Sequence, residues 1–197
     1  MKILLYLEAE KFLRKSGIGR AIYHQKRALD IAGIDYTTNP HEDFDIAHIN
    51  TYGIKSIMLL FRAKRMGKKV IYHGHSTMED FRNSFIGSNL LAPIVKKYLT
   101  FLYRHADLVI TPTDYSKQLI TSYGVNVPVV AISNGIDLSK YCQSPEKEQA
   151  FKNHFQVLPD QKIVMCAALY FKRKGIDDFV KVAEIMPDVR FIWFGET

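Results

Sequence analysis

Two histidines give this sequence its clearest capacity for chemistry. They stand in the segment Tyr72-His73-Gly74-His75-Ser76, at the end of an apolar run of strand length. Side chains at the carboxyl end of a parallel strand face the ligand crevice of an open α/β sheet. A histidine there can donate a hydrogen bond to a sugar hydroxyl or a phosphate, or stabilise developing charge. We predict this role for His75 and a buried place for His73, and no metal site, because no third ligand accompanies the pair.

A glycine-rich segment, Ser16-Gly17-Ile18-Gly19-Arg20, follows the first predicted strand and opens a helix. Glycines at such a junction let backbone N–H groups approach an anion, and the helix N-terminus adds partial positive charge. The complete GxGxxG dinucleotide fingerprint is absent, which disfavours a nicotinamide enzyme. We expect Ser16–Gly19 to form a loop, which is either an anion site or a plain turn from strand to helix.

Two further segments place polar groups where a strand gives way to a helix. Thr111-Pro112-Thr113-Asp114 ends one strand, and Thr113 or Asp114 either caps the next helix or contacts a ligand. Lys172-Arg173-Lys174-Gly175 puts three cations before a helix N-terminus, an arrangement that suits a pyrophosphate. A solvated basic loop is the alternative for the second segment.

Short apolar runs alternate with segments of helical periodicity along the chain. The runs predict strands at residues 2–7, 35–37, 45–49, 69–72, 108–110 and 127–132. The periodic segments predict helices at residues 18–32, 54–67, 91–104 and 116–123. Strands separated by helices indicate βαβ units, so we expect an α/β fold with a Rossmann-like, doubly wound parallel sheet.

The pattern changes after Asn134-Gly135, a turn signal, and then starts again. We expect an N-terminal Rossmann-like domain at residues 1–135 and a linker at 136–160 with a short helix at 146–155. Residues 161–197 would then hold one βαβ unit, with a strand at 162–169, a helix at 176–186 and a strand at 190–194. One unit cannot cover its own apolar faces, so we expect the chain to be a fragment of a longer, two-domain protein.

The charge is concentrated in one part of the 197-residue chain. Its 27 Lys and Arg against 20 Asp and Glu give a net charge of +7, while residues 55–104 hold ten cations and two anions. Such an imbalance implies an anionic partner: nucleic acid, anionic lipid or a phosphorylated substrate. A solvated basic face without a partner is the alternative. Only two cysteines are present, which is typical of a reducing compartment.

Five motifs in order, SGIGRA, HGHS, ADLVITPTDYSK, SNGIDLSKY and KRKGIDDF, resemble those of retaining GT-B glycosyltransferases of family four. The segments TMEDFRNSF and KRKGIDDFVKVAEIMPDVRFIWFG are most similar to Gram-positive members that extend glucosyl-diacylglycerol, the glycolipid anchor of lipoteichoic acid. The resemblance implies two Rossmann-like domains and transfer of a hexose from UDP-glucose or UDP-galactose, without a cofactor.

The resemblance also implies roles for individual residues. His75 matches the family's histidine that contacts the donor sugar, and Lys174 the lysine that binds the donor diphosphate. Gly17 and Gly19 match the loop near the donor phosphates, and Arg173 is a further diphosphate candidate. Candidates for the acceptor contact or the interdomain hinge are Ser76, Glu79, Thr113, Asn134 and Asp137.

The sequence departs from the family pattern in two places. The family has an arginine five or six residues before the lysine, where this chain has Leu169 and Ala168. Arg173 or Lys172 is a candidate to replace it. The paired glutamates that grip the nucleotide-sugar are absent from the 197 residues, so we expect the fragment alone to be inactive or nearly so.

A glycolipid acceptor lies in a bilayer, which gives the basic region a specific role. Residues 54–69 and 90–104 combine apolar positions with cations, a pattern typical of helices that bind anionic lipid from one side. Packing against the sheet is the alternative for both helices. The expected location is therefore cytoplasmic and peripheral, on the inner face of the plasma membrane.

Other classes of protein remain open at this stage. A nucleic-acid-binding module would explain the charge, but no recognised binding motif accompanies it, so we predict no nucleic-acid partner. A non-catalytic basic binding domain, or a family-four enzyme acting on another cell-envelope or capsular acceptor, are the remaining alternatives. The sequence does not indicate an oligomeric state.

Overall fold

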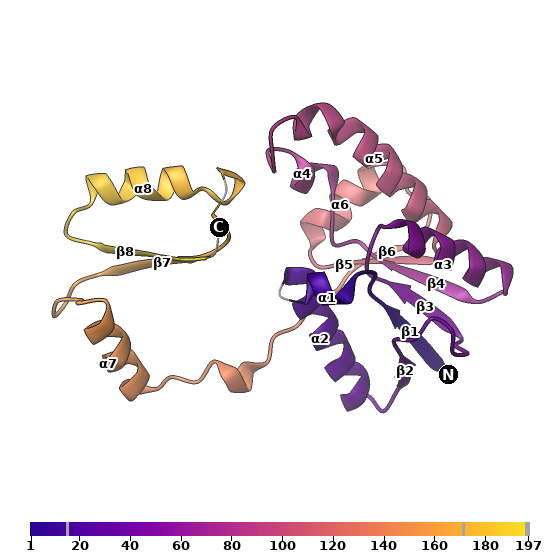
Figure 1. Ribbon diagram of the computed structural model, residues 1–197, viewed down its shortest axis with the longest axis horizontal. Coiled ribbons are helices and arrows are strands. Elements are labelled where there is room, and N and C mark those ends of the chain that lie inside the picture. The colour runs from indigo at the N-terminus through magenta and orange to yellow at the C-terminus, as the bar shows by residue number, and fades with distance from the viewer. Residues whose placement is uncertain (15, 171, 196–197) are drawn as a thin grey trace. The chain divides into compact units, whose positions relative to one another are not determined.

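The computed structural model describes residues 1–14, 16–170 and 172–195 (Figure 1). The chain divides into two compact units. The first contains Met1–Phe81 and Asn89–Asp137, and the second contains Arg82–Ser88 and Leu138–Thr197. Each unit is described by itself below. The last two residues of the predicted segment 161–197 lie outside the described residues.

A six-stranded parallel sheet forms the first unit, in the order β2-β1-β3-β4-β5-β6. The strands are β1 (Lys2–Tyr6), β2 (Asp35–Thr37), β3 (Ile46–Ile49), β4 (Lys69–His73), β5 (Leu108–Thr111) and β6 (Val129–Ala131). Ile3 pairs with Tyr36 on one side and with Ile46 on the other. The predicted α/β class with a Rossmann-like parallel sheet is confirmed.

Helices cover both faces of this sheet (Figure 1). The long helices are α2 (Gly17–Ile31), α3 (Ile54–Arg65), α5 (Ser88–His105) and α6 (Asp114–Ser122). From β1 the chain moves to β2, toward one edge of the sheet. From β3 it moves through β4 and β5 to β6, toward the other edge. Right-handed crossovers therefore place α2 on one face and α3, α5 and α6 on the other. Two single-turn helices, α1 (Glu10–Leu13) and α4 (Met78–Phe81), were not predicted, because one turn carries too little periodicity.

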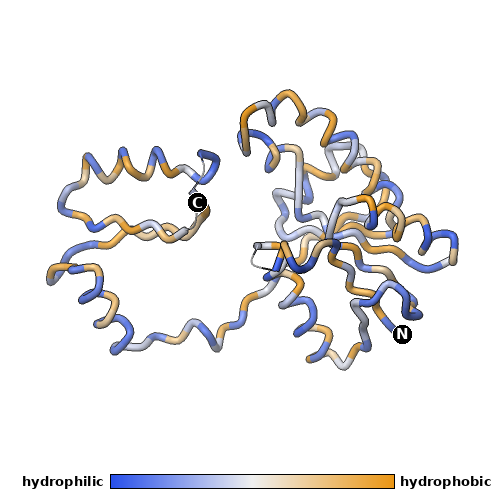
Figure 2. Tube along the Cα trace, viewed as in Figure 1, coloured by the Kyte–Doolittle hydropathy of each residue, from blue (hydrophilic) through white to orange (hydrophobic). Residues whose placement is uncertain are grey.

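The core lies between the sheet and the helices α3, α5 and α6. Alternate strand positions point into it, and the helices contribute fully buried leucines and an isoleucine. Its members include Leu4, Ala47, Ile49, Val70, Val109, Leu60, Leu102 and Ile120. Figure 2 shows hydrophobic segments along the strands and also in the first turns of α5.

The second unit contains one parallel strand pair, β7 (Ile163–Ala167) and β8 (Arg190–Phe194). Its helices are α7 (Pro145–His154) and α8 (Ile176–Ile185), with short 3₁₀ turns η1 (Leu138–Lys140) and η2 (Lys172–Lys174). The Phe179 ring of α8 lies 5.2 Å, centroid to centroid, from the rings of Phe191 and Trp193. This is the βαβ unit that the sequence predicted.

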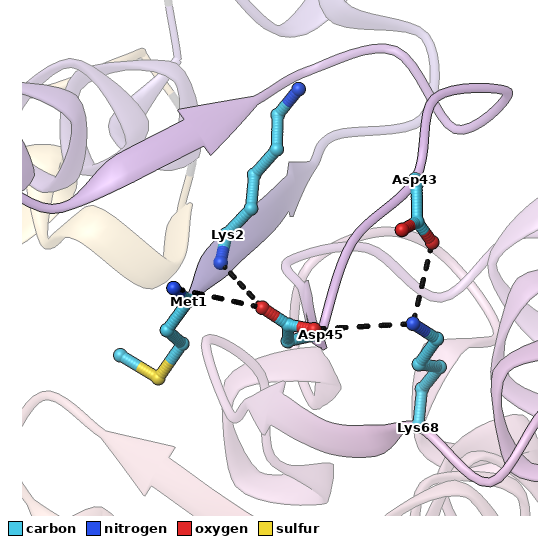
Figure 3. Close-up of polar contacts among 5 residues, drawn as sticks. All are labelled: Met1, Lys2, Asp43, Asp45 and Lys68. Carbon is cyan, nitrogen blue, oxygen red and sulfur yellow. Dashed lines mark hydrogen bonds and ion pairs between the residues drawn. The ribbon is translucent and has the colours of Figure 1, made fainter.

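A cluster of ions secures the amino end of the sheet (Figure 3). The Asp45 carboxylate accepts a hydrogen bond from the backbone N–H of Lys2 at 2.8 Å and lies 3.8 Å from the Met1 amino group. The Lys68 ammonium lies 3.3 Å from Asp43 and 4.0 Å from Asp45. These contacts are exposed and contribute little stability, but they compensate the charge of Lys68.

The two glycines of the predicted anion loop differ in their surroundings, and this difference gives a test of the fold. A Cβ on Gly19 would lie 2.2 Å from the Leu13 carbonyl oxygen, whereas one on Gly17 meets nothing within 4 Å. We expect Gly19→Ala to destabilise the protein by about 1–3 kcal/mol, because α1 must move away from α2. Gly17→Ala is the matched control and should change stability by less than about 0.5 kcal/mol. Urea unfolding of both variants measures the difference, and equal stability would contradict the close approach.

Candidate functional site

A group of polar side chains gathers at the carboxyl end of the first sheet. Asn50 follows β3, His73 ends β4, and His75 lies two residues further on. Gln25 reaches the same place from α2, the helix that follows β1. Parallel strands place their carboxyl ends at one edge, which is why residues distant in sequence meet here.

Three imidazole rings form a column at this edge. The rings of His48 and His73 lie 5.3 Å apart at 13°, and those of His73 and His75 lie 4.0 Å apart at 12°. The middle ring, His73, is only 4% exposed, so its predicted buried position is confirmed. Its Nδ1 atom lies 3.2 Å from His48 Nε2.

Two amides connect the column to the helix. The Gln25 Nε2 amide lies 3.0 Å from Asn50 Oδ1 and 3.1 Å from His73 Nδ1. Asn50 is fully buried, and its Oδ1 also lies 3.0 Å from His75 Nε2. One amide oxygen therefore receives contacts from α2 and from the segment after β4.

Burial keeps all three histidines neutral. It lowers the pKa of His48 to about 3, with a smaller contribution from His73. It lowers the pKa of His73 to about 4, against a hydrogen bond to Asn134 that acts in the opposite direction. The pKa of His75 falls to about 3, first through burial and then through His73 and His48. At neutral pH this column offers hydrogen-bonding nitrogens and no positive charge.

Tyrosine hydroxyls hold the turn that carries His75. Tyr52 donates to the His73 carbonyl at 3.1 Å and accepts from the Ser76 backbone N–H at 2.9 Å. Tyr103, which is fully buried, donates to the Ser76 carbonyl at 2.8 Å. A Cβ on Gly74 would lie 2.8 Å from Ile120 Cδ1, so a larger residue there would have to displace the end of the Ile120 side chain.

Three of the predicted acceptor or hinge residues have structural partners. The backbone of Ser76 is held by the two tyrosines. The Glu79 carboxylate accepts a hydrogen bond from the Tyr123 hydroxyl. Thr113 is the N-cap of α6, and its hydroxyl accepts from the Ser116 N–H in a capping box. Helix capping, one of the two interpretations that the sequence left open, therefore accounts for the position of Thr113.

The other two candidates of this set lie near the end of the first unit. Asn134 lies close enough to His73 to oppose the lowering of its pKa, and its buried Oδ1 atom has no hydrogen-bond partner among the described residues. Asp137 forms an ion pair with Arg27 of α2. Both residues therefore connect the segment after β6 to the elements that carry the histidine column.

The predicted glycine loop is in fact the cap and first turn of α2. The Ser16 hydroxyl accepts a hydrogen bond from the Gly19 N–H at 3.3 Å, and the helix begins at Gly17. The expectation that Ser16–Gly19 forms a loop is wrong, because a serine N-cap makes helical backbone favourable from the next residue.

The diphosphate candidates lie in the second unit. Arg173 and Lys174 are exposed in η2, just before Gly175, the N-cap of α8. The backbone φ of Gly175 is 79°, a conformation that favours glycine. Asp177 and Asp178 occupy the first turn of α8. The structure does not bring the two cations together with His75 within one unit.

Sequence reasoning missed several residues of the site, chiefly Gln25, His48, Asn50 and Tyr52. Asn50 follows a predicted strand directly, so the rule that selected His75 could also have selected it. Gln25 stands in the middle of a helix and His48 within a strand, where no local signal marks either residue.

No group of three or more metal-ligating side chains suitable for a metal ion occurs among the described residues. Over the same residues, no helix combines the length and hydropathy needed to cross a bilayer.

The fold agrees with the comparisons to known proteins. The family model for Glycosyltransferase Family 4 matches residues 38–140, more than half of the chain. The chain therefore belongs to glycosyltransferase family 4. The family resemblance stated from the five motifs is confirmed.

Two curated relatives are glycolipid-synthesising enzymes by name. The chain is 52% identical over 198 residues to the processive diacylglycerol alpha-glucosyltransferase of Acholeplasma laidlawii, covering 99% of this chain and 58% of that protein. It is 28% identical over 200 residues to the alpha-galactosylglucosyldiacylglycerol synthase of Streptococcus pneumoniae, covering 99% and 53%. The chain spans somewhat more than half the length of these relatives.

A solved structure shares the fold. Anabaena HepE, crystallised in complex with UDP-glucose, superposes with a TM-score of 0.69 at 18% identity, covering 100% of this chain and 61% of that one. The likeness supports the Rossmann-like α/β fold that the sequence predicted.

The histidine column predicts how stability depends on pH. The folded pKa values of about 3 to 4 lie below the value of about 6.5 expected for unfolded histidine. The unfolded state therefore binds more protons, and stability falls as the pH drops from about 6.5 towards 4. His48→Gln should remove one of the protons that are taken up on unfolding. The slope of the free energy of unfolding against pH should then fall by about 1.4 kcal/mol per pH unit.

Urea unfolding of the protein, followed by tyrosine fluorescence at several pH values between 4 and 7, measures that slope. His41→Gln, which removes an exposed histidine, is the matched control and should leave the slope unchanged. Equal slopes in the wild type and His48→Gln would show that His48 is not held neutral.

Proposed function

We propose that the full-length protein is a retaining glycosyltransferase that transfers a hexose from UDP-glucose or UDP-galactose to a glycolipid acceptor, glucosyl-diacylglycerol. The 52% identity to a diacylglycerol alpha-glucosyltransferase carries this proposal. The UDP-glucose complex of HepE supports the donor class, because that protein has the same fold. The lipoteichoic acid anchor and the Gram-positive source remain predictions.

The histidine column suits recognition of a sugar. Neutral imidazoles and amides form directional hydrogen bonds with hydroxyl groups and bring no charge that would favour a phosphate instead. In this proposal His75 contacts the donor sugar, while Lys174 and Arg173 bind the donor diphosphate. The cations stabilise the negative charge that develops on the leaving nucleoside diphosphate. Gly17 and Gly19 contribute the N-terminal turn of α2 near the phosphates.

A basic surface on α3 and α5 is the proposed site of membrane contact. Each helix buries one apolar row, including Leu60 and Leu102, yet exposes a second one. The exposed row contains Met58, Phe61, Leu90, Leu91, Ile94 and Phe101. The Phe61 and Phe101 rings, whose centroids are 6.1 Å apart, connect the two helices. An apolar row with adjacent cations suits the interface of an anionic leaflet.

Two hollows flank this aromatic pair. One, of about 750 Å³, is lined by apolar residues with Lys55, Arg62 and Arg65. The other, of about 540 Å³, is lined by apolar residues with Lys96, Lys97 and Arg104. No carboxylate lines either hollow within the described part of the chain. Anionic headgroups are the chemistry that such hollows fit.

The cations of this region fall into two sets. Lys64 and Lys69 pair with Asp107, and Lys68 pairs with Asp43 and Asp45 (Figure 3). The six cations that line the hollows have no carboxylate within ion-pairing distance among residues 1–14, 16–170 and 172–195. Their charge is therefore available to an anionic partner at the surface.

The division of the cations into a paired set and a set that lines the hollows predicts how the protein binds lipid. We expect vesicles rich in phosphatidylglycerol to sediment the protein at low salt and high salt to release it, because screening weakens exposed charge pairs. Lys55→Gln/Arg62→Gln/Arg65→Gln should reduce the bound fraction at least fivefold. Lys64→Gln/Lys68→Gln/Lys69→Gln removes the same charge from paired positions and should reduce it far less. Equal losses, or no sedimentation of the wild type, would contradict the assigned surface.

The transfer reaction tests the donor site. We expect His75→Ala and Lys174→Ala in the full-length protein to lower hexose transfer to glucosyl-diacylglycerol by at least 100-fold, since each removes a group that contacts the donor. A screen of UDP-glucose and UDP-galactose with radiolabelled donor measures the product. Lys140→Ala, in η1, is the control and should retain activity. Near-normal transfer in both site variants would refute the assignments.

A further inference from the structure

The hydrogen bonds of Asn50 determine which nitrogen of His75 carries the proton. The Asn50 Nδ2 amide donates to the His48 carbonyl at 3.4 Å, and a carbonyl can only accept. This contact orients the Asn50 amide, so that its Oδ1 atom faces Gln25 and His75. An amide oxygen also only accepts, and therefore the His75 Nε2 atom, 3.0 Å away, must be the donor.

Gln25 supports the same orientation from the helix. Its Nε2 amide has two hydrogens, which meet Asn50 Oδ1 at 3.0 Å and His73 Nδ1 at 3.1 Å. The reverse orientation of both amides would place Asn50 Oδ1 against the His48 carbonyl, where two acceptors repel. The orientations of the two amides are therefore consistent with each other, and they leave Gln25 Oε1 buried without a hydrogen-bond partner among the described residues.

A neutral His75 with its proton on Nε2 has a lone pair on Nδ1. No partner for this Nδ1 atom occurs within the described residues, so it remains free to accept a hydrogen bond. A sugar hydroxyl can donate to it, whereas a phosphate oxygen cannot. The nitrogen therefore selects for a hydroxyl at the reacting end of the donor.

We propose that Asn50 is a positioning residue which, together with Gln25, holds His75 as the neutral Nε2–H tautomer and presents its Nδ1 atom as an acceptor for a donor-sugar hydroxyl. This inference rests on the proposed sugar transfer for its function, but the tautomer itself does not. The titratable groups that face His75 are His73 and His48, and both oppose its protonation.

Nitrogen-15 NMR of the histidine rings tests the tautomer directly in the 197-residue chain. We expect His75 to show a protonated Nε2 and an unprotonated Nδ1 at pH 7. In Asn50→Ala the ring should become a mixture of tautomers, because no acceptor fixes Nε2–H. Protonated Nδ1 in the wild type, or the same tautomer in Asn50→Ala, would overturn the proposal.

The isosteric variant Asn50→Asp tests the functional part. A carboxylate at this position favours the imidazolium, which has no acceptor nitrogen. Transfer by the full-length variant should fall about 10- to 100-fold at pH 6 and recover as the pH rises and His75 loses its proton. The kcat should change more than the KM for donor. A loss without recovery at higher pH would indicate a merely structural role and overturn the assignment.

The two measurements separate the two proposals. If the wild-type protein forms no glycolipid but NMR shows the Nε2–H tautomer, the proposed function fails and the positioning by Asn50 stands. If the wild type is active and NMR shows the other tautomer, the positioning fails and the function stands.

Discussion

The buried amide of Asn50 is the interaction on which the site depends. Its oxygen accepts from Gln25 of α2 and from His75 beyond β4, and its nitrogen donates to the His48 backbone. A buried polar group without partners costs free energy, so these contacts form together or not at all. Through one side chain, the helix after β1 and the turn after β4 are fixed to the middle of the sheet.

The tyrosines complete this arrangement from the opposite face. Tyr52, Tyr72 and Tyr103 pack with ring centroids about 6 Å apart, and their hydroxyls bind backbone atoms of the segments after β3 and β4. Burial of the rings stabilises the core, while the hydroxyls hold the His75 turn. The same residues therefore contribute both to stability and to the geometry of the site.

Sequence periodicity predicted the order and type of the main elements, because alternating apolar runs and helical spacing are local signals. His75 could be predicted from the sequence for the same reason, since it follows a predicted strand. Gln25 and His48 could not be predicted in this way, because their role arises from contacts between residues 25 to 48 positions apart. The first turn of α2 was misassigned because two glycines obscured a serine cap. The division of the cations into two sets also needed the structure, since Lys64 pairs with Asp107 whereas the neighbouring Arg65 has no carboxylate within ion-pairing distance among the described residues.

The neutrality of the histidine column has a consequence for how the protein would respond to its surroundings. The column carries no charge at neutral pH, so on the proposed function salt that screens the cations of α3 and α5 has little effect on its hydrogen bonds. Changes in ionic strength would alter how long the molecule stays on a surface without altering how it recognises a hydroxyl. Attachment and recognition would then depend on separate groups of residues, so that each could be tuned by substitution on its own.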